Sequence, residues 1–326
     1  MNENQGLMGG GLARLMRNKR YIFWFWLVNL ALAAFATASF RRNADAILDH
    51  SLYAQNLTNG FHLSTFFEML STPEFPRMNS MTVPAFYFAF VFFLFTAIFL
   101  PGVFAGYASE YRLPREDFFR ACGRNLWRFI RLMIIAAIVV GIVAGILFAA
   151  NGAVVKKAGE SVDEVLPFEL QMIGLGIIFL IMTTLRIWFD LAEADIVLND
   201  QRAVRRSVAA GFRHTVLSFG RLLGTYVLTT MVAAILLVGG LLVWIQFVPA
   251  HSVARAFIVG QIILFLLLFP RFWQRGIAVA YWQQRMLIPV VATQPVVEAP
   301  APVVVIPVEP TPAPVIPAAP IETQES

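Results

Sequence analysis

Four polar residues near the middle of the chain recur at helical spacing beside long apolar stretches. Thr183, Arg186, Asp190 and Glu193 are three or four positions apart, so a helix would carry them on one face. Charged side chains inside an apolar span indicate a proton or ion pathway by default. Arg186 follows the predicted start of its span, Pro167, by about 28 Å of helix, which places it close to a membrane surface. We therefore predict an interfacial ion-pair cluster of Arg186, Asp190 and Glu193, with a gating or relay role as the alternative.

Residue types suited to catalysis or metal binding are few. The sequence contains no GxSxG, HExxH, CxxC or glycine-rich phosphate-binding motif, and its four histidines are scattered. Cys122 is the single cysteine, which excludes an intramolecular disulfide and multi-cysteine metal sites. His50 and His62 have no framework of acids around them, so we interpret them as loop residues and not as metal ligands. We expect no catalytic residues, no bound metal and no cofactor.

The composition is typical of a membrane protein. Hydrophobic residues make up 58% of the 326 positions and charged residues only 14%, well below the roughly 25% of soluble domains. The formal net charge is +5, but the basic residues flank apolar stretches and do not form one continuous patch. That pattern favours contact with anionic lipid head groups over nucleic acid. The predicted fold is all-α, a multi-pass transmembrane helical bundle.

Six stretches are long and apolar enough to be predicted as spans, given a hydrocarbon core about 30 Å thick. They cover about residues 21–40, 84–107, 132–150, 167–191, 222–248 and 254–273. The first ends in AFATAS, so a cleaved signal peptide is the alternative there. The charge-free part of the sixth is short, and we expect Arg255 and Arg271 at its ends to extend towards water. Together the six spans form a predicted membrane domain over residues 21–286.

The remaining segments differ from the spans in composition. Residues 1–20 are polar, glycine-rich and then basic, and we predict a cytoplasmic N-terminal segment. Helical spacing of apolar residues predicts short helices in the outer loop 41–83. Residues 287–326 hold ten of the 18 prolines and no basic residue, which predicts a disordered proline-rich tail.

Basic residues also set the predicted orientation. Nineteen of the 25 lysines and arginines fall on one side if the N-terminus is inside, so both termini are expected in the cytoplasm. Two arginine-rich amphipathic segments on that side predict helices lying in the interface. Their arginines form a predicted basic cytoplasmic face of Arg120, Arg124, Arg128, Arg202, Arg206 and Arg213. Asp195 and Asp200 lie where arginines of neighbouring inner segments could reach them.

The segment ADIVLNDQRAVRRSVAAGFRHTVLSFGRLLGTYVL, residues 194–228, resembles poorly characterised bacterial inner-membrane proteins. These are akin to the membrane domain of glycerophosphodiester phosphodiesterases. The resemblance implies a six-helix membrane module, without the soluble catalytic barrel of those enzymes. The first functional prediction is a non-enzymatic module that assembles with or regulates other envelope proteins, or forms homo-oligomers. The alternative is a transporter or permease for a lipid-like or small hydrophobic substrate.

Overall fold

The structure is a computed structural model that describes residues 6–48, 79–160, 165–248 and 252–287. Within these ranges every regular element is an α-helix and no β-strand occurs. A helix pairs its backbone N–H and C=O groups within one segment, as a membrane interior requires. Most of the predicted outer loop 41–83 and almost all of the tail 287–326 lie outside the described residues.

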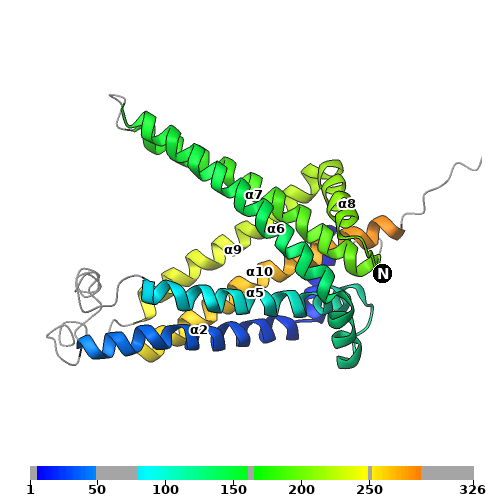
Figure 1. Ribbon diagram of the computed structural model, residues 1–326, viewed down its shortest axis with the longest axis horizontal. Helices are drawn as coiled ribbons and strands as arrows, with labels where there is room; N and C mark the ends of the chain where they lie inside the picture. The colour runs from blue at the N-terminus through cyan, green and yellow to red at the C-terminus, as the bar shows by residue number, and fades with distance from the viewer. Residues whose placement is uncertain (1–5, 49–78, 161–164, 249–251, 288–326) are drawn as a thin grey trace, which may run out of the picture. The chain divides into compact units, whose positions relative to one another are not determined.

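Eight helices make up the described part of the chain (Figure 1). They are α1 (Leu7–Arg17), α2 (Arg20–Leu48), α5 (Asn79–Ala108), α6 (Arg115–Ala158), α7 (Leu166–Leu198), α8 (Val204–Leu217), α9 (Phe219–Phe247) and α10 (Val253–Leu287). Five of them, α5, α6, α7, α9 and α10, are long and apolar enough to cross a membrane. In α2, the apolar part with described side chains, Arg20–Phe35, is shorter than these five. The chain therefore has the helices of a multi-pass membrane protein.

Helix α6 is longer than a single membrane crossing. Its 44 residues span about 66 Å, roughly twice the hydrocarbon thickness. It begins after Pro114, and Glu116 and Asp117 in its first turn interact favourably with the positive end of the helix dipole. The arginine-rich segment predicted to lie as a separate helix is thus continuous with the predicted third span. In the second half of the chain, by contrast, α8 is a separate helix between α7 and α9.

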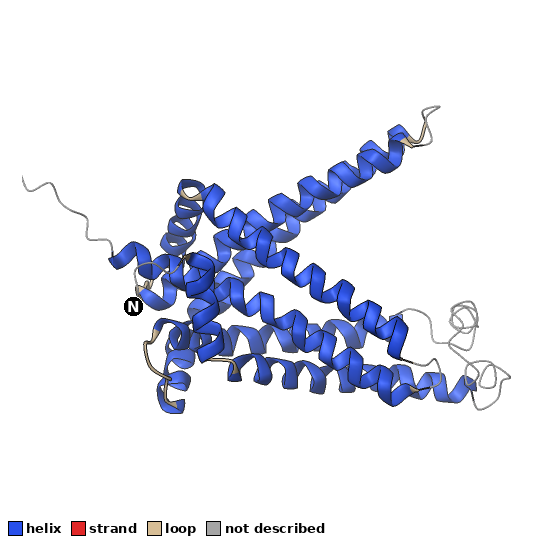
Figure 2. Ribbon diagram, turned by 180° about the vertical axis from the view of Figure 1, so that it is seen from behind, coloured by secondary structure: helices blue, strands red, loops and turns tan. Residues whose placement is uncertain are grey.

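Buried side chains gather at one end of the bundle, which we call the core end. The buried positions of α9 lie within its first eleven residues, and the core cluster takes Phe129 and Leu132 from the first half of α6. Farther along α6, Ile138, Ile142 and Ile146 are exposed, as expected of surfaces that face lipid. Both views show α6 and α7 side by side, and they show α2, α5 and α10 together as neighbours (Figures 1 and 2).

Glycines allow close helix crossings at the core end. A Cβ atom on Gly276 of α10 would lie 2.6 Å from the carbonyl oxygen of Gly11 in α1. Gly102 and Gly106 of α5 lie against Cys122 and Tyr21, respectively. A Cβ atom added at Gly141 or Gly145 of α6 would meet no other part of the described chain within 4 Å.

Candidate binding site between the helices

The three charged residues predicted to share a face of α7 line one cavity of about 560 Å³. Within the described residues, however, no ion pair joins Arg186 to Asp190 or Glu193. Asp190 instead accepts a hydrogen bond from the hydroxyl of Tyr226 in α9, at 3.1 Å. The structure therefore brings the predicted cluster together around a cavity without pairing its charges directly.

Hydrogen bonds of Tyr226 and Thr230 with Gln274 join α9 to α10 next to this cavity. The amide nitrogen of Gln274 donates to the hydroxyl of Thr230, at 3.0 Å, and lies 3.3 Å from the Tyr226 carbonyl oxygen. The Tyr226 hydroxyl is also 3.1 Å from the Gln274 carbonyl oxygen. Because Asp190 accepts from the same hydroxyl, these hydrogen bonds fix one wall of the cavity across three helices.

Helix α10 contributes two more arginines to the same region. Arg271 and Arg275 are four residues apart, one helical turn, and both line cavities next to Glu193. The guanidinium of Arg275 lies over the ring of Phe272, 5.2 Å from its centroid, which is a cation–π contact. Arg271 was expected to extend outward to water, but the structure turns it into the bundle.

Several polar atoms of this region are buried without a hydrogen-bond partner among the described residues. They are Nε of Arg186, Nη1 of Arg271, Nε of Arg275, Oε2 of Glu193 and Oε1 of Gln274. Gln274 is only 2% exposed and Arg275 only 6%. Most buried polar groups in proteins are hydrogen-bonded, because an unpaired group costs about 1–3 kcal/mol. All five atoms belong to residues that line neighbouring cavities, which is a feature of a site for a polar ligand.

Three cavities meet at these residues. Their volumes are about 530, 560 and 420 Å³, and Arg271 lines all three. The rest of their walls is mainly apolar, with side chains such as Trp26, Phe93 and Leu268. We call the set Arg186, Asp190, Glu193, Arg271 and Arg275 the charged cluster. It contains three arginines and two carboxylates, so its formal charge is one positive unit.

The spacing of Arg271 and Arg275 in the sequence could have identified them as candidate site residues. Arg271 and Arg275 repeat in α10 the four-residue spacing of Arg186 and Asp190 in α7, directly after the charge-free stretch 256–270. Tyr226 and Gln274 could not have been assigned in this way. A tyrosine or glutamine near the end of a span is common, and only the packing of α9 against α7 and α10 gives these two their partners.

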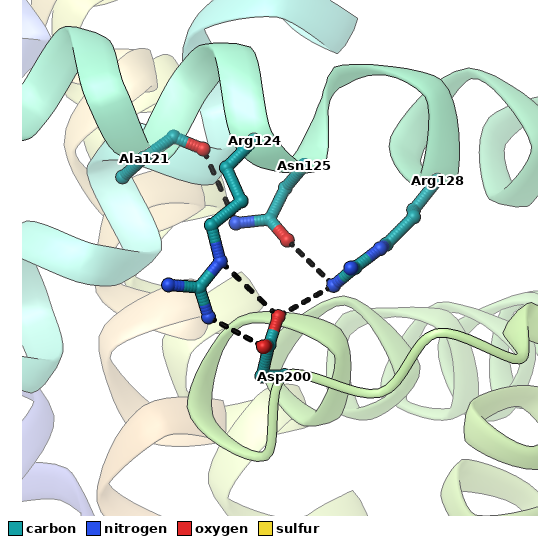
Figure 3. A network of polar contacts seen from close by, with 5 residues as sticks. All are labelled: Ala121, Arg124, Asn125, Arg128 and Asp200. Atoms are coloured by element: carbon teal, nitrogen blue, oxygen red, sulfur yellow. Dashed lines mark hydrogen bonds and ion pairs between the residues drawn. The ribbon is translucent and has the colours of Figure 1, made fainter.

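Asp200 joins the two arginine-rich segments outside the cavities (Figure 3). Its carboxylate oxygens lie 2.6 Å from nitrogens of both Arg124 and Arg128 on α6. Hydrogen bonds from these two guanidiniums lower the pKa of Asp200 to about 2. The predicted pairing of Asp200 with arginines of a neighbouring segment is confirmed, and the cytoplasmic position of that segment stays a prediction. Asp195 differs, because it accepts a hydrogen bond from Asn199 at 2.6 Å.

The predicted basic face divides into two parts. Arg120 pairs with Glu116 and Asp117 of its own helix, while Arg124 and Arg128 hold Asp200. The other part, Arg202, Arg206 and Arg213, is exposed on and beside α8. Phe212 and Val216 of α8 are also more than half exposed. Exposed arginines next to exposed apolar side chains are typical of a helix at a membrane surface.

The described residues contain no group of three or more His, Cys, Asp or Glu side chains placed to hold a metal ion. His50 and His62 lie outside them. Comparison with protein-family models, with curated proteins and with solved structures finds no match to this chain. The resemblance to bacterial inner-membrane proteins therefore stays a prediction, and the site has to be interpreted from its own geometry.

Proposed function

We propose that this chain is a transporter or permease-like protein that takes a lipid-like or small hydrophobic substrate into the cavities around the charged cluster. In this proposal it crosses the bacterial inner membrane six times, α2 being the first span, with both termini in the cytoplasm. The arginine-rich start of α6 and the exposed face of α8 then lie at the cytoplasmic surface, where they contact anionic lipid head groups.

One observation carries the proposal: residues that hold buried polar atoms without hydrogen-bond partners line cavities whose remaining walls are mainly apolar. A purely structural bundle would lose stability by keeping such atoms unpaired. Ligand sites are typically concave and mainly apolar, with a few convergent polar groups, and in helical proteins they often lie between helices. This combination favours the transporter over the assembly module, although the sequence alone favours the module.

Assembly with other envelope proteins, or with a second copy of this chain, is the second candidate. The observation that favours it is the exposed second half of α6, where Gly141 and Gly145 have no neighbour in the described chain within 4 Å. Small residues four positions apart permit close approach of helices in lipid.

Lipid movement in reconstituted vesicles tests the proposal. We expect the purified chain to accelerate exchange of a fluorescent phospholipid between leaflets by about tenfold or more over protein-free vesicles, a barrier reduction of about 1.4 kcal/mol. Arg271→Gln should return the rate towards that of empty vesicles, whereas the exposed variant Arg120→Gln should keep the wild-type rate. A wild-type rate equal to that of empty vesicles would exclude lipid transport and favour the assembly module.

A further inference from the structure

Resting on the proposed function, we infer that the charged cluster binds the phosphate of a monoanionic phospholipid, whose acyl chains lie along the apolar cavity walls. The cluster has three guanidiniums, from Arg186, Arg271 and Arg275, which match phosphate oxygens in geometry and charge. A lipid enters such a site from the membrane, without crossing water.

The charge of the cluster selects the class of ligand. Counted as formal charges, the carboxylates Asp190 and Glu193 balance two of the three arginines, which leaves one positive charge among the residues that line the cavities. An unpaired charge is costly in a low-dielectric interior. A phosphodiester with a neutral head group supplies the one negative charge that balances it, whereas a zwitterionic lipid adds no net charge.

Unpartnered donors show where the phosphate would bind. Nη1 of Arg271 and Nε of Arg275 are buried and free of hydrogen bonds, and Arg275 is nine-tenths buried. The two residues line the same cavity, of about 420 Å³, together with Asn29 of α2. Asp190, which accepts a hydrogen bond from the Tyr226 hydroxyl, does not line this cavity.

The apolar walls distinguish a lipid from a free phosphate ion. Leu30, Leu264 and Leu267 line the first cavity, and Ala136, Val140 and Phe179 line the second. Both cavities also contain Arg186 and Arg271, so one molecule could reach the arginines with its head group and the apolar walls with its chains. Each buried methylene adds to the affinity, so the chains contribute strongly.

Native mass spectrometry of the full chain in a neutral detergent tests this inference with three probes. These are short-chain phosphatidylglycerol, phosphatidylcholine with the same chains, and inorganic phosphate. We expect one phosphatidylglycerol per chain, bound about tenfold more tightly than phosphatidylcholine because only the former neutralises the cluster. Inorganic phosphate should bind about 100-fold more weakly than phosphatidylglycerol because it lacks chains to bury. Equal affinity for the two lipids would overturn the inference, and phosphate binding as tight as phosphatidylglycerol would identify a free anion as the ligand.

Charge-matched variants separate binding at the cluster from association with the protein surface. Arg271→Gln should weaken phosphatidylglycerol binding about 30-fold, since it removes from the site a positive charge that would contact the lipid phosphate. Adding Glu193→Gln to that variant restores the formal positive charge and should recover part of the lost affinity, which a purely structural role of Arg271 would not produce. The matched surface variant Arg206→Gln, on exposed α8, should bind like the wild type. A loss with Arg206→Gln as large as with Arg271→Gln would move binding to the surface and contradict the inference.

Thermal unfolding of each variant in the same detergent checks its folding. If Arg271→Gln does not fold, the relative affinity of the wild type for phosphatidylglycerol and phosphatidylcholine still tests the inference. The outcome also separates this inference from the proposed function. Equal binding and transport of both lipids would retain the transporter and reject the phosphate site, whereas no bound lipid and no transport would reject both.

Discussion

Charged side chains in this protein divide into two groups by their access to water. Asp200 and Arg124 lie at the surface, about half exposed, and their partner Arg128 is less exposed. The charged cluster lies among apolar side chains, where each unpaired polar atom has a larger effect on stability. The exposed group therefore suits a structural contact between helices, and the buried group suits recognition of a ligand.

Asp200→Asn tests the surface contact without changing the backbone. Asp200 has a φ of 48°, a left-handed conformation that asparagine also adopts readily, so the substitution removes mainly the charge. Because the carboxylate is 45% exposed, we expect the loss at neutral pH to be only about 1 kcal/mol or less. The unfolding midpoint of the purified protein measures it, with Arg120→Gln as an exposed control that should change the midpoint less.

The pH dependence of that loss follows from the lowered pKa of Asp200. Its pKa falls from the ordinary 3.8 to about 2 in the folded protein, so the stabilisation is fully present above pH 3.8. It is lost as the pH falls through about 2, where the folded state also becomes protonated. Wild type and Asp200→Asn should therefore converge in stability over this window, and a difference independent of pH would contradict the ion pair.

Helix α1 shows why part of the fold could not be predicted from the sequence. The polar, glycine-rich start of the chain was predicted as a cytoplasmic segment, without a helix. Glycine disfavours helices, so its local sequence does not indicate one. In the structure these residues form a helix packed on α10, with Arg14 donating to the side chain of Gln283 at 2.5 and 3.1 Å. Glycines weaken the isolated helix α1, but they also allow it to pack closely on α10. This second effect cannot be inferred without the position of α10.

Gly276→Ala tests that crossing. The added Cβ would meet the backbone carbonyl of Gly11, which cannot rotate away, so we expect a loss of about 1–3 kcal/mol. Gly9→Ala is the matched control, because a Cβ there has nothing within 4 Å and alanine favours the helix. Unfolding midpoints in detergent should fall for Gly276→Ala and stay equal or rise for Gly9→Ala. Equal effects of the two changes would argue against the close packing of α1 on α10.

For the whole molecule, the lengths of apolar stretches were sufficient to predict membrane-crossing helices. Five of the six predicted spans correspond to helices long and apolar enough to cross, and the first predicted span, in α2, stays a prediction. Composition could not predict which helices become neighbours, and therefore could not bring Arg271 of α10 to Glu193 of α7. The sequence shows which polar residues share one helix, whereas the site is formed by polar residues of several helices that pack together.

Cysteine labelling tests the proposed orientation of the whole chain. Arg206→Cys places a thiol on exposed α8, and Glu160→Cys places one at the exposed opposite end of α6. A reagent that cannot cross membranes should label Glu160→Cys in intact cells, and Arg206→Cys only after permeabilisation. The native Cys122 is buried, so the wild type provides a low background. The reverse labelling pattern would show that the orientation is wrong.

A lipid held by the charged cluster should be visible in a cryo-electron microscopy structure of the full chain in lipid nanodiscs that contain phosphatidylglycerol. We predict lipid density whose phosphate contacts Arg271 and Arg275, with chains along the apolar cavity walls. A structure in which Arg186 and Arg271 instead pair with Asp190 and Glu193, and side chains close the cavities, would contradict this account.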